Sequence, residues 1–438
     1  MAGTLTINHL TKIEGHATLT LQVDGVKVKK CELSSIEGSR YFEGIVKGRR
    51  YDEAPEITSR ICGICSCAHT IAAIMAVEDG FGVQPSKQTM QLRKLLTIGE
   101  RIRSHATHLY FLALPDYFGV DSAIAMLPKH KKEVQRALRL MKAGNEIIRT
   151  VGGRDLHPVS AQVGGFLRVP SAREMRALRE SLKPMRADAL ATAKLFGNLK
   201  IPEFERKTDC LSLYTGRDYP ILEGRLKCET REFERKDYGK YFREYQEPYS
   251  TANFVVKEGK SYMVGALARV NNNFKFLHPS ARKIAADAGV VFPKCNPFLN
   301  NFAQSLELVH YAEESVGLCE KLENAKFEPL APARVGKGKG ATGIEVPRGI
   351  LWHYYEFDDR GVITGANIVT PTAQNLRNMQ DDIRALLPGL LGKAGKGKGG
   401  LSKEKIVLEV EKLIRSYDPC FSCSTHFLKV KWLKGKKN

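Results

Sequence analysis

The chain carries two Cys-x-x-Cys pairs, one near each end. Cys62 and Cys65 lie in the segment RICGICSCAH, and Cys420 and Cys423 lie in DPCFSCSTH. Thiolates bind nickel, zinc, copper(I) and the iron of iron–sulfur clusters, whereas hard ions prefer oxygen ligands. If the two pairs meet in space, the fold closes around a buried metal, and we expect the function to reside there.

The spacing alone leaves the identity of the metal open. A structural zinc site is the usual interpretation of two such pairs. Zinc ribbons, however, keep their pairs within roughly 15–20 residues of each other, because the metal replaces a core that a short segment lacks. A chain of 438 residues can bury a core without that help. A zinc site therefore stays an alternative at this point.

The composition is that of an ordinary globular protein, with 43% hydrophobic and 26% charged residues. No apolar run approaches the ~18–20 residues that span a bilayer. The N-terminus lacks the basic-then-apolar pattern of a secretory signal, and ten cysteines are too few for a disulfide scaffold in a chain of this length. We therefore expect a cytoplasmic protein without a membrane span, although a subunit can also be exported on its partner's signal.

The net charge of +20 raises the possibility of a nucleic-acid partner. The Lys and Arg residues are spread along the chain, however, and no helix-turn-helix, RRM or zinc-finger pattern accompanies them. Two Gly/Lys-rich stretches, 335–343 and 392–405, are predicted to be solvated loops, because glycine is flexible and lysines repel one another. We predict no nucleic-acid partner, since a protein with an acidic face would account for the charge equally well.

The elements that must position the cysteines are mostly helices. A helix is predicted to start near His69, directly after the first pair, and another over 404–418 leads into the second pair. Sustained helical periodicity predicts further long helices over 88–114, 130–150, 171–197 and 299–326.

Strands are predicted at the periphery. Alternating apolar and polar residues indicate hairpins over 16–34, with a turn at Asp24–Gly25, and over 350–371. Residues 207–263, rich in Tyr, Gly, Asp and charge, are predicted to form a peripheral strand-and-loop insertion. The predicted fold class is therefore α+β and predominantly α, a bundle of long helices with peripheral β-hairpins.

At the two cysteine segments the chain resembles the large, catalytic subunit of NiFe-hydrogenases. The first segment matches that family's R-x-C-G-x-C-x-x-x-H pattern, and the second matches its D-P-C-x-x-C-x-x-H pattern. KIEGH (12–16), the surroundings of Glu43, VPRG (346–349) and TPT (370–372) also match, so the resemblance covers essentially the whole chain. Within the family, the chain is most similar to the cytoplasmic bidirectional group that includes the archaeal sulfhydrogenases.

The resemblance implies a nickel ion held by all four cysteines. Cys62 and Cys420 would be terminal nickel ligands, while Cys65 and Cys423 would bridge to an iron that carries carbon monoxide and two cyanides. The implied reaction is the reversible, heterolytic cleavage of dihydrogen to protons and electrons. The Cys420 thiolate would be the first proton acceptor, and Glu14 of KIEGH would be the carboxylate that gates proton transfer.

The resemblance also implies a structural magnesium ion near the C-terminal end. Its protein ligands would be Glu43, His426 and the backbone carbonyl of Ile368. Magnesium keeps several waters and takes few carboxylates, so this sparse ligand set is plausible.

Residues around the metals receive their roles only through the resemblance. Arg348 would overhang the diatomic ligands, and Pro371 and Thr372 would contact one of the cyanides. His69 would hydrogen-bond near a bridging cysteine. Ser104 stands where other branches of the family carry an aspartate, which is a departure from their pattern.

The resemblance finally implies how the chain is organised and what it works with. Residues 1–426 would form a single catalytic domain, and a maturation peptidase would remove the extension 427–438 after nickel chaperones had loaded the site. An iron–sulfur small subunit, and diaphorase-type electron-transfer subunits beyond it, would pass electrons to a soluble acceptor such as NAD(P). This chain itself contains no Rossmann fingerprint. A non-catalytic hydrogenase-like scaffold and a structural zinc protein are the alternative functions.

Overall fold

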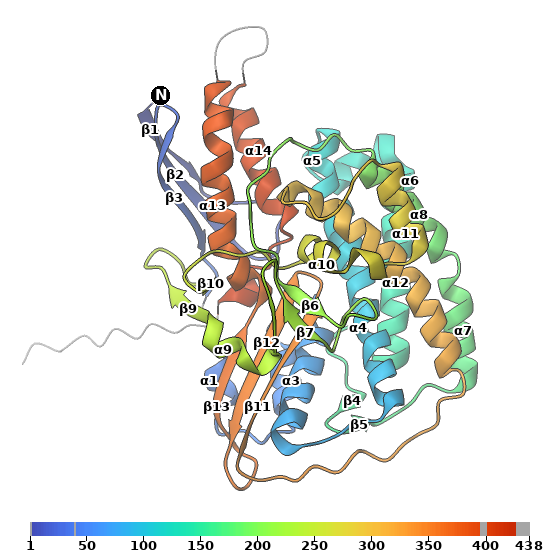
Figure 1. The fold of residues 1–438 in the computed structure, drawn as a ribbon. Helices are drawn as coiled ribbons and strands as arrows, with labels where there is room; N and C mark the ends of the chain where they lie inside the picture. Colours follow the sequence, from blue (N-terminus) through green and yellow to red (C-terminus); the bar gives the residue numbers. More distant parts are fainter. Residues whose placement is uncertain (1, 39–40, 395–400, 426–438) are drawn as a thin grey trace, which may run out of the picture.

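The computed structural model describes residues 2–38, 41–394 and 401–425. Most long helices pack together on one side of the molecule, at the right in Figure 1, and small antiparallel sheets of two or three strands lie beside and below them. This arrangement confirms the predicted α+β, predominantly α fold class. Among the described residues, no helix has both the length and the apolar character needed to cross a membrane.

The bundle is built around α4 (Lys87–Thr107), whose second half is almost entirely buried. It packs against α6 (Ala123–Gly152) and α12 (Asn300–Leu322). The helix predicted over 88–114 continues from α4 into a π-helix, η1 (His108–Ala113), and then into α5 (Leu114–Phe118). Such π-turns inside helices are frequent at functional sites.

The predicted helix over 171–197 is in fact two helices, α7 (Ala172–Leu182) and α8 (Met185–Gly197). Pro184 separates them, because proline lacks a backbone N–H and disfavours helical geometry in the residue before it. The capping box of Ser171 and Glu174 fixes the start of α7. Both helices cover α12 on its outer side.

Two three-stranded sheets pack against α13 and α3, respectively (Figure 1). The first sheet has the order β1-β2-β3, and its strand β3 packs against α13. The second has the order β11-β12-β13, and its strands β11 and β12 pack against α3. The bounds of these elements are β1 (Ala2–Ile7), β2 (Ala17–Asp24), β3 (Lys27–Ser35), α3 (Ser66–Phe81), β11 (Gly338–Val346), β12 (Gly349–Phe357), β13 (Ile363–Val369), α13 (Pro371–Gly392) and α14 (Lys403–Ser416). They confirm the predicted hairpins and the helices next to both pairs.

The prediction of a solvated loop over 335–343 is wrong, because strand β11 begins at Gly338. The glycines of this stretch allow the strand to approach α3 closely. A Cβ atom at Gly340 would collide with the backbone of Ala76 and Gly80. Of the second Gly/Lys stretch, residues 395–400 lie outside the described residues, while Lys403 already belongs to α14.

Residues 207–263 form short strands and loops, as predicted, and include buried side chains such as Leu211, Leu213 and Phe254. Their status as an insertion stays a prediction. The elements of this region and the remaining short ones are α1 (Phe42–Val46), α2 (Ala54–Ser59), β4 (Ala161–Gln162), β5 (Gly165–Phe166), β6 (Ser212–Tyr214), β7 (Arg225–Lys227), β8 (Glu232–Phe233), η2 (Arg235–Asp237), α9 (Tyr238–Tyr241), β9 (Phe242–Gln246), β10 (Asn253–Lys257), α10 (Ala266–Asn273), η3 (Phe274–Phe276), α11 (Pro279–Asp287), η4 (Pro297–Leu299) and η5 (Ser422–Ser424).

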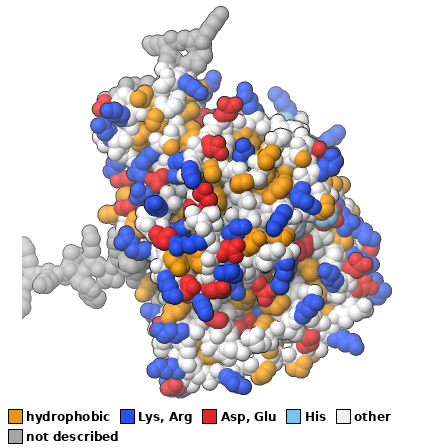
Figure 2. Space-filling model, viewed as in Figure 1, with side chains coloured by type: hydrophobic (Ala, Val, Ile, Leu, Met, Phe, Trp, Pro, Cys, Tyr) orange, Lys and Arg blue, Asp and Glu red, His pale blue; other side chains and the backbone are white. Residues whose placement is uncertain are grey.

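The basic residues are distributed over the surface rather than gathered on one element. On the face shown in Figure 2, Lys and Arg side chains alternate with Asp and Glu across the whole view. Many of them form exposed ion pairs, such as Lys283 with Asp287 and Arg139 with Asp188. Mixed charge of this kind favours solubility more than it favours the binding of a polyanion such as a nucleic acid.

We expect Gly144→Ala to destabilise the bundle, because α4 and α6 cross at a pair of glycines. A Cβ atom at Gly144 would lie 2.6 Å from the carbonyl oxygen of Gly99 and 2.8 Å from the amide nitrogen of Arg103. Overpacking of this kind typically costs about 1–3 kcal/mol, and here the obstacle is backbone. Thermal unfolding measures the effect. Gly317→Ala in α12 is the matched control, since nothing lies within 4 Å of its Cβ position; equal melting temperatures for the two variants would contradict the prediction.

Candidate metal centre

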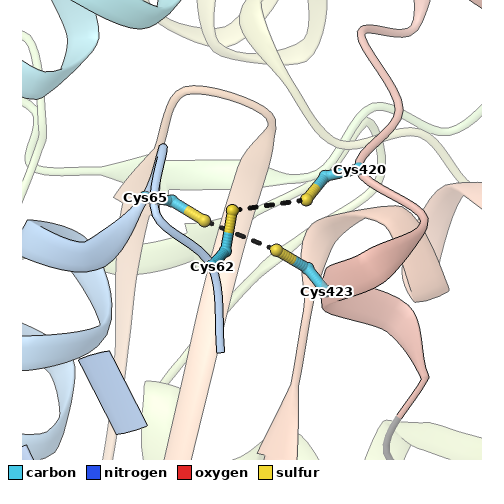
Figure 3. A group of neighbouring side chains, drawn as sticks. All are labelled: Cys62, Cys65, Cys420 and Cys423. Carbon is cyan, nitrogen blue, oxygen red and sulfur yellow. Dashed lines mark hydrogen bonds between the residues drawn. The ribbon is translucent and has the colours of Figure 1, made fainter. Parts of the chain in front are cut away.

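The structure brings the two cysteine pairs together at one buried point (Figure 3). The Sγ atoms of Cys62 and Cys420 lie 3.7 Å apart, and those of Cys65 and Cys423 lie 3.4 Å apart. All four sulfur atoms lie within 4.8 Å of one another. The first pair precedes the N-terminus of α3, and the second follows α14, so the ends of two helices meet here.

Four thiols at these distances fit a soft or borderline metal ion. Among the described residues, they are the one group of His, Cys, Asp and Glu side chains with such geometry. Hydrogen bonds from the other thiols, that of Cys420 first, lower the pKa of Cys62 well below its usual value. Burial raises the pKa of Cys420 well above it. The cluster therefore favours one thiolate by itself, and a bound metal would deprotonate the rest.

Glu14 lies beside the cluster, because its backbone is bridged to that of Cys420. The amide of Phe421 donates to the carbonyl of Glu14 at 2.9 Å, which aligns the two segments in parallel. The Sγ of Cys420 then donates to Glu14 Oε2 at 2.8 Å, and the hydroxyl of Ser422 donates to Oε1. Gly15 permits this approach, since a Cβ atom there would lie 2.7 Å from the amide nitrogen of Ser422. A thiol and a carboxylate thus share one proton position.

Arg348 occupies the turn between β11 and β12 and is 5% exposed. Its Nε donates to the carbonyl of Asp418 at 2.7 Å, and its Nη2 lies 3.0 Å from the carboxylate of the same residue. Its Nη1 is buried and has no hydrogen-bond partner in the part of the chain that the structure describes. Ser104 is also buried and its hydroxyl lacks a hydrogen bond within the same ranges.

A small cavity adjoins three of the cysteines. It is lined by Cys65, His69, Val346, Pro347, Arg348, Leu351, Thr370, Pro371, Thr372, Cys420 and Cys423. Most of this lining is apolar, yet the Nη1 of Arg348 and the hydroxyl of Thr370 lack partners among the described residues. Buried donors of this kind need acceptors. Small metal ligands with acceptor atoms would satisfy them, so the cavity fits the diatomic ligands that the resemblance implies.

Pro371 and Thr372 form the first turn of α13 and lie at this cavity. Thr372 also fixes the second pair, because its Oγ1 accepts from the amide of Cys420 at 2.9 Å. His69 lines the cavity from α3, and its Nδ1 lies 3.1 Å from the Nε2 of His353. Pro371, Thr372 and His69 therefore line one cavity, while the contacts predicted for them, with a cyanide and near a bridging cysteine, stay predictions.

The predicted magnesium ligands are brought together as far as the structure describes them. Glu43 Oε1 accepts from the amide of Ile368 at 2.7 Å. Burial raises the pKa of Glu43 to about 7, and the nearby carboxylate of Glu244 adds to the increase. Two half-buried carboxylates near each other are a reasonable place for a hard cation. His426 lies outside the described residues, and Glu244 was not among the predicted ligands.

Two residues of α4 that sequence reasoning missed hold the first cysteine segment. The carboxylate of Glu100 accepts from the amides of Cys67 and Ala68, at 2.7 and 3.2 Å. One turn further, Arg103 donates to the carbonyl of Ile64 at 2.7 Å. A possible signal was that ionic residues occur in a helix with a mostly apolar face, since such residues are rarely buried without a partner.

The comparisons with known proteins agree with this geometry. Residues 40–154 and 295–426 match the family model described as nickel-dependent hydrogenase. Sulfhydrogenase 1 subunit alpha of Pyrococcus furiosus is 33% identical over 97% of this chain and 98% of its own length. The beta subunit of the NAD-reducing hydrogenase HoxS from Cupriavidus necator is 30% identical over 98% and 96%.

Solved structures give the same result. A crystal structure of an NAD+-reducing [NiFe]-hydrogenase in the H2-reduced state matches with a TM-score of 0.86 at 25% identity, covering 97% of this chain and 100% of that one. The [NiFeSe]-hydrogenase of Dm. baculatum matches with a TM-score of 0.77 at 21% identity over 97% and 100%, a likeness of fold.

We expect Glu100→Gln to remove a pH dependence from the stability of the chain. Burial raises the pKa of Glu100 to about 7 from a usual 4.5. Relative to the variant, the wild type therefore loses stability as pH rises from about 4.5 to about 7, because the unfolded chain releases the proton first. The expected loss is about 3 kcal/mol. Denaturant titrations of both proteins across this pH range measure it, and parallel curves would contradict the prediction.

Proposed function

The chain belongs to the nickel-dependent hydrogenase family as a catalytic large subunit, and we propose that its four cysteines hold a nickel–iron group. The observation that carries the proposal is the buried set of four Sγ atoms within 4.8 Å of one another, with a carboxylate 2.8 Å from one of them. When bound, the group would supply the redox and Lewis-acid chemistry of reversible heterolytic dihydrogen cleavage. A structural zinc site would explain the four sulfur atoms, but it would not explain why the carboxylate of Glu14 lies beside one of them.

We assign nickel to all four cysteines, with Cys62 and Cys420 as terminal ligands. Cys65 and Cys423 would be shared with the iron. Cys65 and Cys423 line the cavity, as this assignment requires, but Cys420 lines it as well, so the division between terminal and shared ligands rests on the resemblance. The buried donors of Arg348 and Thr370 lie on the same side, where they can receive hydrogen-bonding ligands such as one carbon monoxide and two cyanides.

The chain's own part in the reaction is to hold and move a proton. Cys420 Sγ is the acceptor next to the metals, and Glu14 Oε2 is the next position, 2.8 Å away. Ser422 keeps the carboxylate in place by donating its hydroxyl to Oε1 and its amide to Oε2. The proton can therefore pass without a movement of the backbone.

A magnesium ion is the second metal that we propose. Glu43 and the carbonyl of Ile368 would bind it, with His426 as the third protein ligand and Glu244 close by. We further propose that 1–426 is the catalytic domain and that 427–438 is removed during maturation, with a peptidase and nickel chaperones as transient partners. These assignments follow from the resemblance, and His426 and residues 427–438 lie outside the described part of the chain.

An iron–sulfur small subunit is the partner that we propose for electron transfer. The hairpin region after α6 offers it an exposed apolar face, where Leu156, Val159 and Leu167 are 44%, 47% and 60% exposed. Relatives named as subunits of an NAD-reducing hydrogenase and of sulfhydrogenases support further, diaphorase-type subunits and a soluble acceptor such as NAD(P).

This face is linked directly to the first cysteine pair. The amide of His157 donates to Ser66 Oγ at 3.0 Å, and its Nδ1 lies 3.1 Å from the carbonyl of Ser59. Arg103 joins the carbonyls of Ile64 and Asp155. His157 also adopts a φ of 52°, a strained value that is held in place at functional sites. An electron acceptor seated here would be connected to the first cysteine segment through these hydrogen bonds.

We expect the chain purified with its native partner to contain nickel and to show one carbonyl and two cyanide bands in its infrared spectrum. The metal-bound ligands absorb where protein groups do not, so the bands report the nickel–iron group directly. Cys65→Ser should lose all three bands, because it removes a ligand shared with iron. Zinc in place of nickel, without the bands, would mean that the cysteines hold a structural metal and that the catalytic proposal is wrong.

We expect Leu167→Arg to weaken assembly with the small subunit by about 2 kcal/mol or more, since a charge would enter the apolar centre of an interface. Co-purification and sedimentation of the complex measure the effect. Val291→Arg is the matched control, because Val291 is 76% exposed and lies after α11, away from this face. Equal assembly of the two variants would place the partner elsewhere.

A further inference from the structure

The segment that carries Glu14 is bent by two residues in the left-handed region. Gly15 has a φ of 79° and Lys12 has a φ of 58°. Glycine adopts this conformation freely, and the close approach to Ser422 explains its presence. A lysine adopts it at an energetic disadvantage, and such strain persists only when the surrounding structure holds it. Lys12 therefore needs an anchor.

The anchor is a buried ion triad. Lys12 Nζ lies 2.5 Å from Asp116 Oδ1, and Arg415 Nη1 donates to Asp116 Oδ2 at 2.8 Å. The same arginine donates from Nε to the carbonyl of Thr11 at 2.8 Å, and its Nη2 is 3.0 Å from Glu411. Asp116 is 6% and Arg415 3% exposed. The residues before the bend are thus fixed through both backbone and side chain.

We propose that Lys12, Asp116 and Arg415 form a positioning site for Glu14, an inference that rests on the proposed role of Glu14 in proton transfer. Arg415 belongs to the last turn of α14, and Cys420 follows that helix closely. The end of α14 therefore fixes the positions of both Cys420, the proton donor, and Glu14, the acceptor. Without the triad, Lys12 relaxes to an ordinary φ, and the carboxylate moves away from the sulfur.

Stability alone does not account for the triad. Replacing buried ion pairs by apolar residues is often neutral for stability, because desolvation offsets the attraction between the charges. What the triad provides is a fixed geometry at a strained residue next to the metal site. Reaction rates depend steeply on such geometry, and a displacement of about 1 Å can lower a rate about 100-fold.

The test compares Lys12→Ala with Lys12→Gly in the holoenzyme with its native partner. Both variants lose the ion pair, but only alanine retains the penalty for positive φ. We expect Lys12→Ala to lower kcat for dihydrogen oxidation about tenfold more than Lys12→Gly does. The KM for dihydrogen, the nickel content and the infrared bands should stay unchanged. In Lys12→Ala, the solvent deuterium isotope effect should rise, and the amide of Phe421 should exchange faster.

Asp116→Asn gives an independent measurement, and Lys283→Ala, which breaks an exposed ion pair on α11, is the control. We expect a loss of kcat of about tenfold for the former and none for the latter. Equal kcat for the alanine and glycine variants at Lys12, or a wild-type kcat for Asp116→Asn, would overturn the inference. Glu14→Gln distinguishes a failure of the proposed role of Glu14 from a failure of the positioning role of the triad. If it keeps the wild-type kcat, the proposed role of Glu14 fails; if it abolishes turnover while the triad variants keep the wild-type kcat, only the triad is wrong.

Discussion

The structure depends on one constraint, which is that four thiols from opposite ends of the chain must meet within 4.8 Å. Each pair lies largely outside the long helices and strands, since Cys65 caps α3 and Cys423 lies in the short helix η5. The first pair is held from α4, by Glu100 on two amides and by Arg103 on one carbonyl. The second is held by Thr372 of α13 and by the bridge to Glu14. The surrounding bundle serves to keep these supports in place.

Residues at the end of α14 contact most of the segments that surround the second cysteine pair. Arg415 holds the N-terminal segment through Thr11, and Asp418 holds Arg348 above the cavity. The carbonyl of Ser416 accepts from Asn300 of α12, which ties the same turn to the helical bundle. Parts of the chain that are remote in sequence thereby become a single rigid site, and a rigid site keeps reacting atoms at fixed distances.

Much of the fold and the site could be predicted from local sequence patterns. The residues that hold the cysteine segments in place could not. The cysteine spacing predicted the cluster, the resemblance of the KIEGH and VPRG segments pointed to Glu14 and Arg348, and periodicity predicted the long helices. Glycine in 335–343 indicated a loop, whereas its actual reason is the contact of β11 with α3, which only the packed fold reveals. Glu100, Asp116 and Glu244 act on residues far away in sequence. For Asp116 and Glu244, nothing in the neighbouring sequence distinguishes such a carboxylate from a solvated one.

Buried arginines show why these supports are ionic rather than apolar. A guanidinium has five donors in a rigid plane, so one side chain can satisfy a carboxylate and backbone carbonyls together. Arg269 pairs with Glu307 and Glu345 while donating to the carbonyls of Val346 and Pro347, the residues before Arg348. Apolar packing would exclude water equally well, but it would leave those carbonyls unpaired and the loops free to shift. The charges beside the cysteines are therefore explained by the precision that an irregular metal site requires of its backbone.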